Sequence, residues 1–391
     1  MFNVLTLNEI SKQGLNKFPQ GRYKIFSEIN NPDAILLRSY KMHDMDIPTS
    51  VLAIGRAGAG TNNIPINKMS ERGIPVFNAP GANANAVKEL AIAGMLLGAR
   101  NICQASDYVS SLEQSGSELN KAVEAGKKQF VGFELPGKTL GVIGLGAIGV
   151  EVANTALSLG MQVIGFDPAI TVKNAWQLSS GVRQAESLDQ LFQSSDFISL
   201  HIPLVESTKN LVNKDCFLAM KDGAVLLNLA RGEIVENNAA IEALNKGKLH
   251  SFVTDFPTQE LIKHPKVIAL PHLGASTVEA EDNCAIMVAE NIKDYLENGN
   301  IKNSVNFPDS KLTRLDSWRI TLSNANVPNM VGQVSTCIAN AGLNIEDLLN
   351  KSIGDLAYTI VDLNGMPSHE LINQISSIDG VLTLRNLGKP L

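Results

Sequence analysis

The chain has 391 residues, of which 44% are hydrophobic and 18% charged, and its formal net charge is −6. This composition is typical of a globular protein of two or three domains with an ample core. The acidic balance and the lack of a basic run argue against a nucleic-acid or membrane-surface partner. No apolar run approaches the length that spans a bilayer.

The four cysteines lie far apart in the chain and have no metal-ligand spacing. We therefore expect neither a disulfide framework nor a metal site, and a reducing cytoplasm is the expected location. The first twenty residues, "MFNVLTLNEISKQGLNKFPQ", lack the unbroken apolar core of a signal peptide.

The first third of the chain alternates predicted strands and helices. Strand-like runs occur in "DAILLRS", "VLAIGRAGAG" and "IPVFNAP", and residues 87–114 are predicted to form one long helix. Alternation of this kind predicts parallel sheets covered by helices.

A glycine motif follows in "GVIGLGAIGVEVANTALSLGMQVIGFDP", residues 141–168. Gly144, Gly146 and Gly149 have the G-x-G-x-x-G spacing between a predicted strand and a helical pattern, and Asp167 ends the next strand. The first glycine allows a tight turn, the second lets a diphosphate approach the backbone, and the third lets the helix pack on the strand. Asp167 is placed to accept the ribose hydroxyls and to repel a 2′-phosphate, which favours NAD over NADP.

Further strands are predicted in "FISLHIPL", "GAVLLNLARG", "LHSFVTDFP" and "KVIALPHLGAST", with a long helix in "EAEDNCAIMVAENIKDYLENGN". The last roughly 75 residues then follow the order βαββαβ, which is ferredoxin-like. This tail is either a structural or oligomerising appendage or a small-molecule sensor.

Three chemistry-bearing positions come just after the strands that follow the glycine motif: Arg231, the acids of "TDFPTQE", and His272. Taken singly, such an arginine is usually a surface ion-pair partner and such a histidine a loop residue. Together they match what oxidation of an alcohol beside a carboxylate requires. A histidine can accept the hydroxyl proton, a carboxylate can stabilise the imidazolium, and an arginine can hold the substrate carboxylate.

The segments "GLGAIG", "FDP", "NLARGEIV" and "LPHLGAST" together resemble the D-isomer-specific 2-hydroxyacid dehydrogenases over residues from about 30 to 306. The tail is similar to the ACT regulatory domain of many members. The resemblance implies an α/β chain with a Rossmann-like cofactor domain inserted in a flavodoxin-like substrate domain. Its implied domains are residues 1–93 with 285–308 for the substrate, 94–284 for NAD, and 316–391 for the ACT domain.

Upstream segments such as "IGRAGAGTNN" and "GIPVFNAPGANANAVKEL" are most similar to members that oxidise D-3-phosphoglycerate with NAD, the first step of phosphorylated L-serine biosynthesis. The resemblance implies a homodimer or homotetramer, with L-serine, the pathway product, as the candidate effector. Two alternatives stay open. One is another 2-hydroxyacid, with hydroxypyruvate or glyoxylate reduction. The other is a non-enzymatic, dinucleotide-sensing corepressor, which a peptide-binding surface or tail would distinguish.

The resemblance also implies roles for individual residues. The predicted catalytic residues are Arg231, Glu260 and His272. The predicted NAD contacts are Gly144, Gly146, Ala147, Ile148, Gly149, Asp167, Ile202, Leu229, Asp255, His272, Gly274 and Ala275. The predicted substrate contacts are Arg38, Arg56, Ala57, Gly58 and Arg231, and the predicted effector contacts in the tail are Asn324, Asn326 and Asn344.

Some of these assignments have a competing interpretation. The acidic segment reads "DFPTQEL", so counting from the aspartate gives Glu260 as the partner of His272, whereas aligning on "FP" gives Gln259. We prefer Glu260, because only a carboxylate stabilises an imidazolium. Lys127 and Lys128 either contact the substrate phosphate from a second subunit or are a solvated helix end. The tail asparagines either bind an effector or cap turns.

Overall fold

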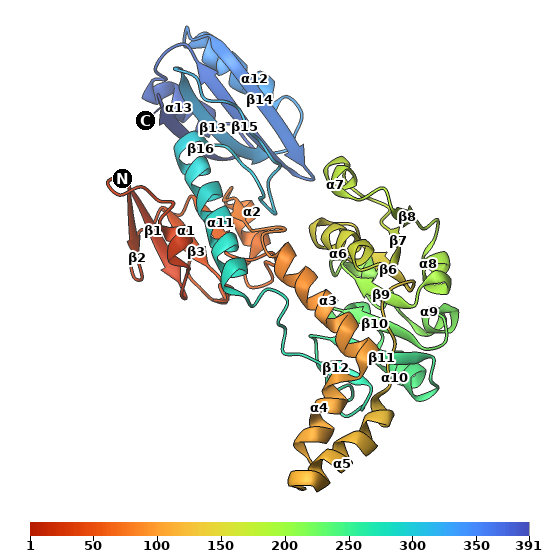
Figure 1. Ribbon diagram of the computed structural model, residues 1–391. Helices are drawn as coiled ribbons and strands as arrows, with labels where there is room; N and C mark the ends of the chain where they lie inside the picture. Colours follow the sequence, from red (N-terminus) through yellow and green to blue (C-terminus); the bar gives the residue numbers. More distant parts are fainter. Residues whose placement is uncertain (391) are drawn as a thin grey trace. The chain divides into compact units, whose positions relative to one another are not determined.

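The computed structural model describes residues 1–390 and divides into two compact units. One unit contains residues 1–83 and 278–391, and the other contains residues 84–277. Figure 1 shows their helices and strands with the labels used below. Within residues 1–390, no helix is both long enough and apolar enough to cross a membrane.

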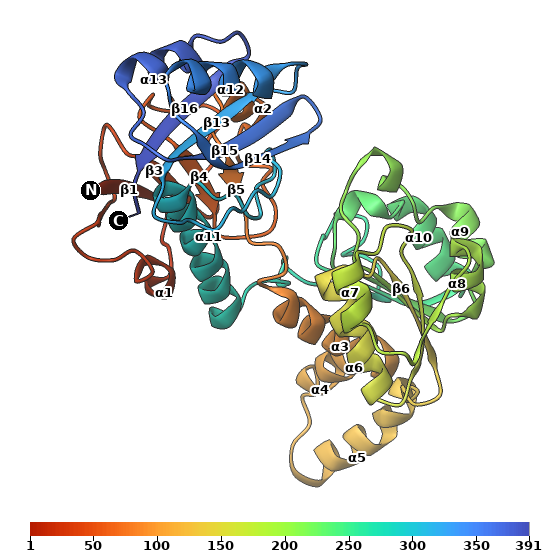
Figure 2. The same ribbon diagram turned by 90° about the horizontal axis from the view of Figure 1, so that it is seen from above.

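The first unit is built on a parallel five-stranded sheet in the order β2-β1-β3-β4-β5, which is the flavodoxin-like order. Its strands are β1 (Phe2–Leu7), β2 (Tyr23–Phe26), β3 (Ala34–Leu37), β4 (Ala53–Arg56) and β5 (Val76–Phe77). Its helices before the tail are α1 (Lys12–Leu15), α2 (Ile66–Glu71) and α11 (Val278–Asn298). The long helix α11 covers one face of the sheet, as Figure 2 shows, and α2 packs on the other.

The second unit has a parallel seven-stranded sheet in the order β12-β11-β10-β9-β6-β7-β8. Its strands are β6 (Thr139–Ile143), β7 (Gln162–Phe166), β8 (Val182–Gln184), β9 (Phe197–Leu200), β10 (Ala224–Asn228), β11 (Leu249–Thr254) and β12 (Val267–Ala269). The order reverses between β6 and β9, which is the point where dinucleotides bind in Rossmann folds. The Rossmann-like and flavodoxin-like sheets of the predicted fold class are therefore confirmed.

Helices cover both faces of this sheet. On one face lie α3 (Ala84–Arg100) and α6 (Ala147–Ser158), whose small and apolar side chains share a core with the strands. On the other face lie α8 (Leu188–Ser194), α9 (Lys214–Ala219) and α10 (Asn237–Asn245). The short helix α7 (Val172–Gln177) has no buried residue.

The prediction of one helix over residues 87–114 is wrong. Asn101 has a φ of 51°, in the left-handed region, and this breaks the segment into α3 and α4 (Ile102–Ser110). Asparagine tolerates that conformation better than most residues. Helix α4 contains no buried residue and packs on α5 (Gly116–Gly126), where the Tyr108 hydroxyl donates to the Ala122 carbonyl at 2.9 Å.

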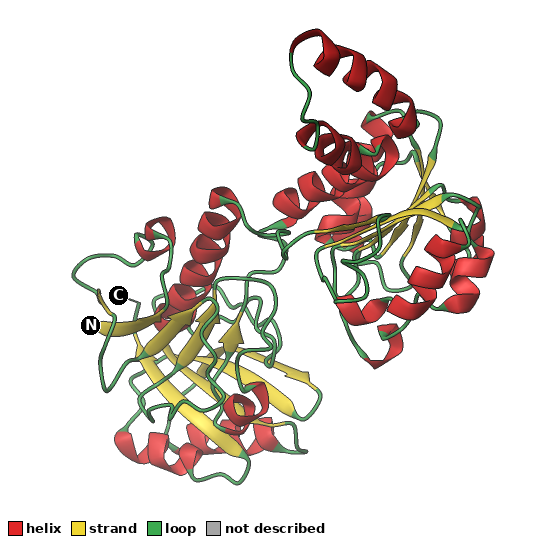
Figure 3. Cartoon of the chain, turned by 90° about the horizontal axis from the view of Figure 1, so that it is seen from below, coloured by secondary structure: helices red, strands yellow, loops and turns green. Residues whose placement is uncertain are grey.

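The tail confirms the predicted βαββαβ order. Its elements are β13 (Trp318–Ala325), α12 (Met330–Asn340), β14 (Ile345–Ile353), β15 (Leu356–Leu363), α13 (His369–Ser376) and β16 (Val381–Gly388). The antiparallel sheet has the order β14-β15-β13-β16, and both helices pack on one of its faces (Figure 3). On the other face, Tyr358 and Ile360 join the core of the five-stranded sheet, so the tail is docked on this unit.

The docked tail caps the C-terminal end of α11. Arg385 of β16 donates to the carbonyls of Tyr295 and Leu296 at 2.9 and 2.8 Å, and Arg319 of β13 donates to the carbonyl of Asn298 at 3.0 Å. These carbonyls lie in the last turn of the helix, where the Tyr295 carbonyl also accepts from the Gly299 N–H, and cations are favourable at the negative end of the helix dipole. The tail is thus a structural partner of the unit as well as a separate sheet.

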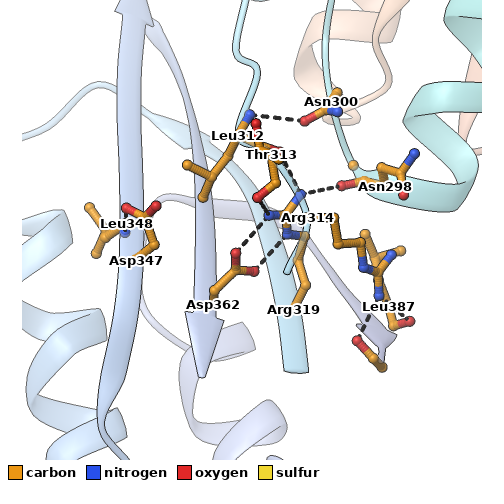
Figure 4. Close-up of polar contacts among 12 residues, drawn as sticks. Asn298, Asn300, Leu312, Thr313, Arg314, Arg319, Asp347, Leu348, Asp362 and Leu387 are labelled. Carbon is orange, nitrogen blue, oxygen red and sulfur yellow. Dashed lines mark hydrogen bonds and ion pairs between the residues drawn. The ribbon is translucent and has the colours of Figure 1, made fainter. Parts of the chain in front are cut away.

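A buried ion pair anchors this junction. Arg319 donates to both oxygens of Asp362 at 2.6 Å, and the two side chains are 0% and 2% exposed. Arg319 also donates to the carbonyls of Leu312 and Thr313 in the linker, as Figure 4 shows. The guanidinium is therefore paired and hydrogen-bonded, which a buried charge requires.

Candidate active site

The glycine loop after β6 has the geometry that its spacing predicts. Gly144 has a φ of 91°, in the region that favours glycine. A Cβ atom on Gly149 would lie 1.9 Å from the Gly144 carbonyl oxygen, so α6 approaches β6 too closely for any side chain there. A Cβ on Gly146 would meet nothing within 4 Å, so open space lies over the N-terminus of α6. This open cradle at a helix N-terminus fits a diphosphate.

Asp167 lies immediately after β7, and its carboxylate is fixed by the backbone. Its Oδ2 atom accepts from the Leu145 N–H in the glycine loop at 2.8 Å, and its Oδ1 atom accepts from the Ala169 N–H at 2.9 Å. Each carboxylate oxygen retains a further lone pair for a ligand hydroxyl. The side chain is half-buried, next to the predicted diphosphate cradle.

The other predicted cofactor contacts follow neighbouring strands of the same sheet at their carboxyl ends. Ile202 follows β9, Leu229 follows β10 and Asp255 follows β11, whereas His272 comes two residues after Leu270, beyond β12. Because these strands are parallel and adjacent, their ends share one edge of the sheet. The structure therefore brings the predicted cofactor contacts of this unit to the edge that carries the glycine loop.

His272 and Asp255 are joined through the backbone. The His272 N–H donates to the Asp255 carbonyl at 3.0 Å, and His272 has a φ of 47°. The ring of Phe256 lies beside the imidazole, with centroids 4.8 Å apart. The histidine is thus held in an unusual backbone conformation, with its side chain exposed.

The Asp255 carboxyl is buried in the charged neighbourhood of His272. Burial raises its pKa, while His272, the Gly274 N–H and Arg231 act to lower it. The Gly274 N–H donates to Oδ2 at 3.3 Å, whereas Oδ1 is buried without a hydrogen-bond partner. Asp255 therefore lies within electrostatic range of Arg231 and His272, two of the predicted catalytic residues.

Glu260 shares an open hollow of about 850 Å³ with His272. Its carboxylate is exposed, and hydrogen bonds from its own backbone N–H and the Thr258 side chain lower its pKa. Within residues 1–390, no hydrogen bond joins Glu260 to His272. The pairing of the two side chains, and the choice between Glu260 and Gln259, stay predictions.

Arg231 is exposed and begins a short 3-10 turn after β10. Its Nη1 atom donates to the Ala230 carbonyl at 2.6 Å. The turn is held by Asn228, which is 1% exposed: its Nδ2 donates to the Arg231 carbonyl at 2.9 Å and its Oδ1 accepts from the Ala230 N–H at 3.2 Å. Sequence reasoning missed this residue, although an asparagine ending the apolar run "AVLLN" was a visible signal.

A second residue that the sequence reasoning missed is His201, directly after β9. Its Nε2 atom lies 2.8 Å from the Ser199 hydroxyl, and its carbonyl oxygen would be 2.5 Å from a Cβ on Gly144. Removal from water lowers the pKa of His201 to about 4. The imidazole beside the glycine loop is therefore neutral at physiological pH.

In the first unit, the predicted substrate arginines lie at the ends of adjacent strands. Arg38 follows β3 and Arg56 ends β4, and the Arg56 Nε donates to the Arg38 carbonyl at 3.0 Å. Arg38 also pairs with Glu281 of α11 at 2.6 Å. The buried Cys284 thiol, whose pKa burial raises to about 11, is influenced by all three charges. Arg38, Arg56 and Glu281 therefore all lie within electrostatic range of Cys284.

Two backbone N–H groups of the loop after β4 donate to carbonyls of β3 and β4. The Ala57 N–H donates to the Leu37 carbonyl at 2.7 Å, and the Gly58 N–H donates to the Arg56 carbonyl at 2.8 Å. Both bonds hold the loop beside the arginines. A contact between this loop and a substrate stays a prediction.

Lys127 and Lys128 lie in the 3-10 turn η1 (Lys127–Phe130), and Lys127 forms an ion pair with Glu124. Both lysines are exposed. The geometry is that of a solvated helix end, and contact with a substrate phosphate stays a prediction.

The tail asparagines lie at opposite ends of the sheet within one chain. Asn324 and Asn326 are near the end of β13, which pairs with the start of β15, whereas Asn344 precedes β14 at the other end. Asn324 is 1% exposed, and its Nδ2 donates to the Ala325 carbonyl at 2.7 Å. Asn329, which precedes α12, has a left-handed φ of 65°. A Cβ atom on Gly332 would lie 2.2 Å from the Asn329 Oδ1 atom, so this side chain fills the space over the first turn of α12.

Comparisons with known proteins agree with this geometry. Residues 92–274 match the family described as D-isomer specific 2-hydroxyacid dehydrogenase, NAD binding domain. The chain is 35% identical to D-3-phosphoglycerate dehydrogenase of Synechocystis sp., covering 99% of this chain and 71% of that protein. It is 40% identical to hydroxypyruvate reductase of Thermotoga maritima, covering 69% of this chain and 85% of that protein.

Among solved structures, NAD⁺-bound 3-phosphoglycerate dehydrogenase from Entamoeba histolytica is similar with a TM-score of 0.60 and 25% identity, covering 78% of this chain and 98% of that chain. The glycine cradle, the anchored Asp167 and the shared strand edge are the features that an NAD site requires. The chain therefore belongs to the D-isomer-specific 2-hydroxyacid dehydrogenase family and is an NAD-dependent oxidoreductase.

Proposed function

We propose that the chain oxidises D-3-phosphoglycerate to 3-phosphohydroxypyruvate with NAD, in the first step of phosphorylated L-serine biosynthesis. The observation that carries the proposal is the pair Arg38 and Arg56, which lie at adjacent strand ends where the Arg56 Nε donates to the Arg38 carbonyl. Two guanidinium groups at one position suit a phosphate dianion. The names of the similar Synechocystis and Entamoeba proteins support the same substrate.

In the proposed mechanism, His272 accepts the proton of the C2 hydroxyl as the C–H bond breaks. Bound NAD supplies a hydride acceptor. Arg231 binds the substrate carboxylate and polarises the developing carbonyl oxygen with its planar guanidinium. Glu260 stabilises the resulting imidazolium, which requires its carboxylate to turn toward His272 within the hollow that both line.

Within the cofactor site, Ala147 and Ile148 would lie over the diphosphate, because they form the first turn of α6 next to Gly146. Asp167 would accept the ribose hydroxyls and disfavour a 2′-phosphate. Ile202, Leu229, Gly274 and Ala275 would complete the pocket from the ends of the adjacent strands.

Hydroxypyruvate or glyoxylate reduction is the competing function, and the similarity to the Thermotoga hydroxypyruvate reductase favours it. The two functions differ in whether the substrate carries a phosphate. Comparing kcat/KM for the reduction of 3-phosphohydroxypyruvate and of hydroxypyruvate with NADH therefore tests the proposal. A corepressor role would leave both compounds without turnover.

The protein would act as a homodimer or homotetramer. Helix α4 has no buried residue, and Ile102 and Val109 are 45% and 50% exposed. A second copy of the chain packed on α4 would bury this apolar surface. Light scattering should show a dimer or larger species that Val109→Asp weakens, while Val172→Asp, a change at an exposed valine of α7, should not.

The tail, residues 316–391, would be an ACT domain that binds L-serine between two copies; its last residue lies outside the described range. Because Asn344 and Asn326 lie at opposite ends of one sheet, two antiparallel copies would bring them together across the exposed edge strand β14. Calorimetry on the full chain should show serine binding that Asn344→Ala removes and Asn373→Ala keeps. No heat at millimolar serine would contradict the assignment.

We place the reaction in the cytoplasm. The four cysteines, Cys103, Cys216, Cys284 and Cys337, are all free thiols. Free thiols suit a reducing compartment.

A further inference from the structure

A small cavity of about 220 Å³ lies where the tail docks on the first unit. Its walls come from the loop before β4, from the segment that follows α2, from α11 and from β16. The lining residues are Thr49, Val51, Leu52, Arg72, Gly73, Ile74, Tyr295, Thr383 and Arg385.

Two arginines on opposite sides of the junction line this cavity. Arg72, which follows α2, donates to the carbonyls of Ile47 and Pro48, each at 2.8 Å. Arg385, in the tail, donates to the carbonyls of Tyr295 and Leu296 and lies 4.4 Å above the Tyr295 ring. Each guanidinium is therefore fixed in place by neutral partners.

The cavity lining contains two arginines and no aspartate or glutamate. A guanidinium has five N–H donors, and the bonds to the carbonyls use two on each arginine. Thr49 adds a hydroxyl at an exposed position. Nearby, Arg314 has a pKa lowered by burial and by the charges of Arg319 and Arg385, which shows that cations are crowded at this junction.

The carboxylate of Asp362 near these cations is already occupied. Among residues 1–390, Asp362 is the acidic group that acts on Arg314, and its two oxygens accept from Arg319. An additional anion would therefore relieve repulsion without displacing an existing partner.

We propose that this cavity binds a small oxyanion, such as inorganic phosphate or a small carboxylate, between Arg72 of the body and Arg385 of the tail. The ligand would bridge the five-stranded sheet and the tail sheet, and neither Arg38 nor Arg56 lines this cavity. Because the ligand would contact both Arg72 and Arg385, it would bind only when the tail is docked on the five-stranded sheet. Its binding would therefore stabilise the docked form. The proposal does not depend on the substrate of the enzyme.

The test is calorimetric titration of inorganic phosphate into the full chain at constant ionic strength, with thermal unfolding recorded in parallel. Arg72→Gln should lower the affinity of the junction site about tenfold or more, because charge-assisted hydrogen bonds are lost. Arg22→Gln is the matched control, since it removes the same charge from an exposed side chain outside the cavity. Arg38→Gln controls for phosphate held at the predicted substrate site.

Arg72→Lys provides a second variant that keeps the charge but not the planar fork, and it should bind phosphate with intermediate affinity. Unfolding without phosphate shows whether each variant is folded. The proposal stands if Arg72→Gln loses a binding event that Arg22→Gln and Arg38→Gln retain. Equal phosphate affinity in Arg72→Gln and wild type, or binding that Arg38→Gln removes completely, would overturn it.

Discussion

The N–H of His272 donates to the carbonyl of Asp255 at 3.0 Å, and this bond joins the segments that follow β11 and β12. It fixes the backbone of the predicted proton acceptor beside a buried carboxyl group. His272 has a left-handed φ, and burial raises the pKa of Asp255. Unusual backbone conformations and shifted pKa values cluster at functional sites.

His272→Ala should lower kcat by about 10²–10⁴-fold, because a general acid–base group contributes that range. NADH binding should be retained, since the glycine cradle and Asp167 lie on other strands. Steady-state rates and NADH fluorescence titration measure the two properties. Turnover close to wild type would remove His272 from the mechanism.

Glu260→Gln should lower the pKa that controls kcat, because the imidazolium of His272 loses its carboxylate partner. Gln259→Ala is the matched control and should leave that pKa in place. Rate profiles from pH 5 to 9 separate the two. If only Gln259→Ala shifts the profile, the alignment on "FP" is the correct one.

Asp255→Asn should raise stability at neutral pH. Burial raises the pKa of Asp255, so the folded chain holds a proton that the unfolded chain releases first as the pH rises. The free energy of unfolding therefore falls with rising pH between the unfolded and folded pKa values.

Asparagine does not titrate, so it removes this loss of stability. At pH values above the folded pKa of Asp255, the free energy of unfolding of Asp255→Asn should exceed that of wild type by about 0.5–2 kcal/mol. The advantage should disappear at acidic pH. Urea unfolding from pH 4 to 8 measures both. A variant that is less stable than wild type at pH 7, with an unchanged pH slope, would contradict this account of Asp255.

Arg319→Met should cost about 3–5 kcal/mol, because Asp362 would be left buried and unpaired. Replacing both residues, in Arg319→Met with Asp362→Leu, should recover much of the loss. Urea unfolding of the full chain measures the free energies. Arg22→Met, at an exposed arginine whose contact with Glu297 is long, should change stability by less than about 1 kcal/mol. A cost for Arg319→Met as small as that of Arg22→Met would show that the tail is not anchored there.

The sequence predicted the parallel sheets, the glycine loop and the tail order well, because local patterns determine them. The apolar runs and the G-x-G-x-x-G spacing each indicate a structure without knowledge of distant residues. The break at Asn101 was missed because the apolar pattern continues through it, while only the backbone conformation of one residue ends the helix.

Contacts between distant segments could not be predicted. The caps that Arg319 and Arg385 form on α11 join residues far apart in the chain, as does the pairing of Arg38 with Glu281. Arg38 and Arg56 were identified only through the family resemblance. Nothing in their local sequence shows that they meet at adjacent strand ends.

The proposed substrate carries a phosphate, and two compounds that differ only in this group test the proposal. Reduction of 3-phosphohydroxypyruvate and of hydroxypyruvate with NADH should be compared by kcat/KM in wild type and in Arg38→Gln. We expect a preference for the phosphorylated compound of at least about 10²-fold, because its phosphate would form charge-assisted hydrogen bonds that hydroxypyruvate cannot form. We also expect Arg38→Gln to reduce this preference while leaving hydroxypyruvate turnover nearly unchanged. An equal or higher kcat/KM for hydroxypyruvate in wild type would contradict the claim.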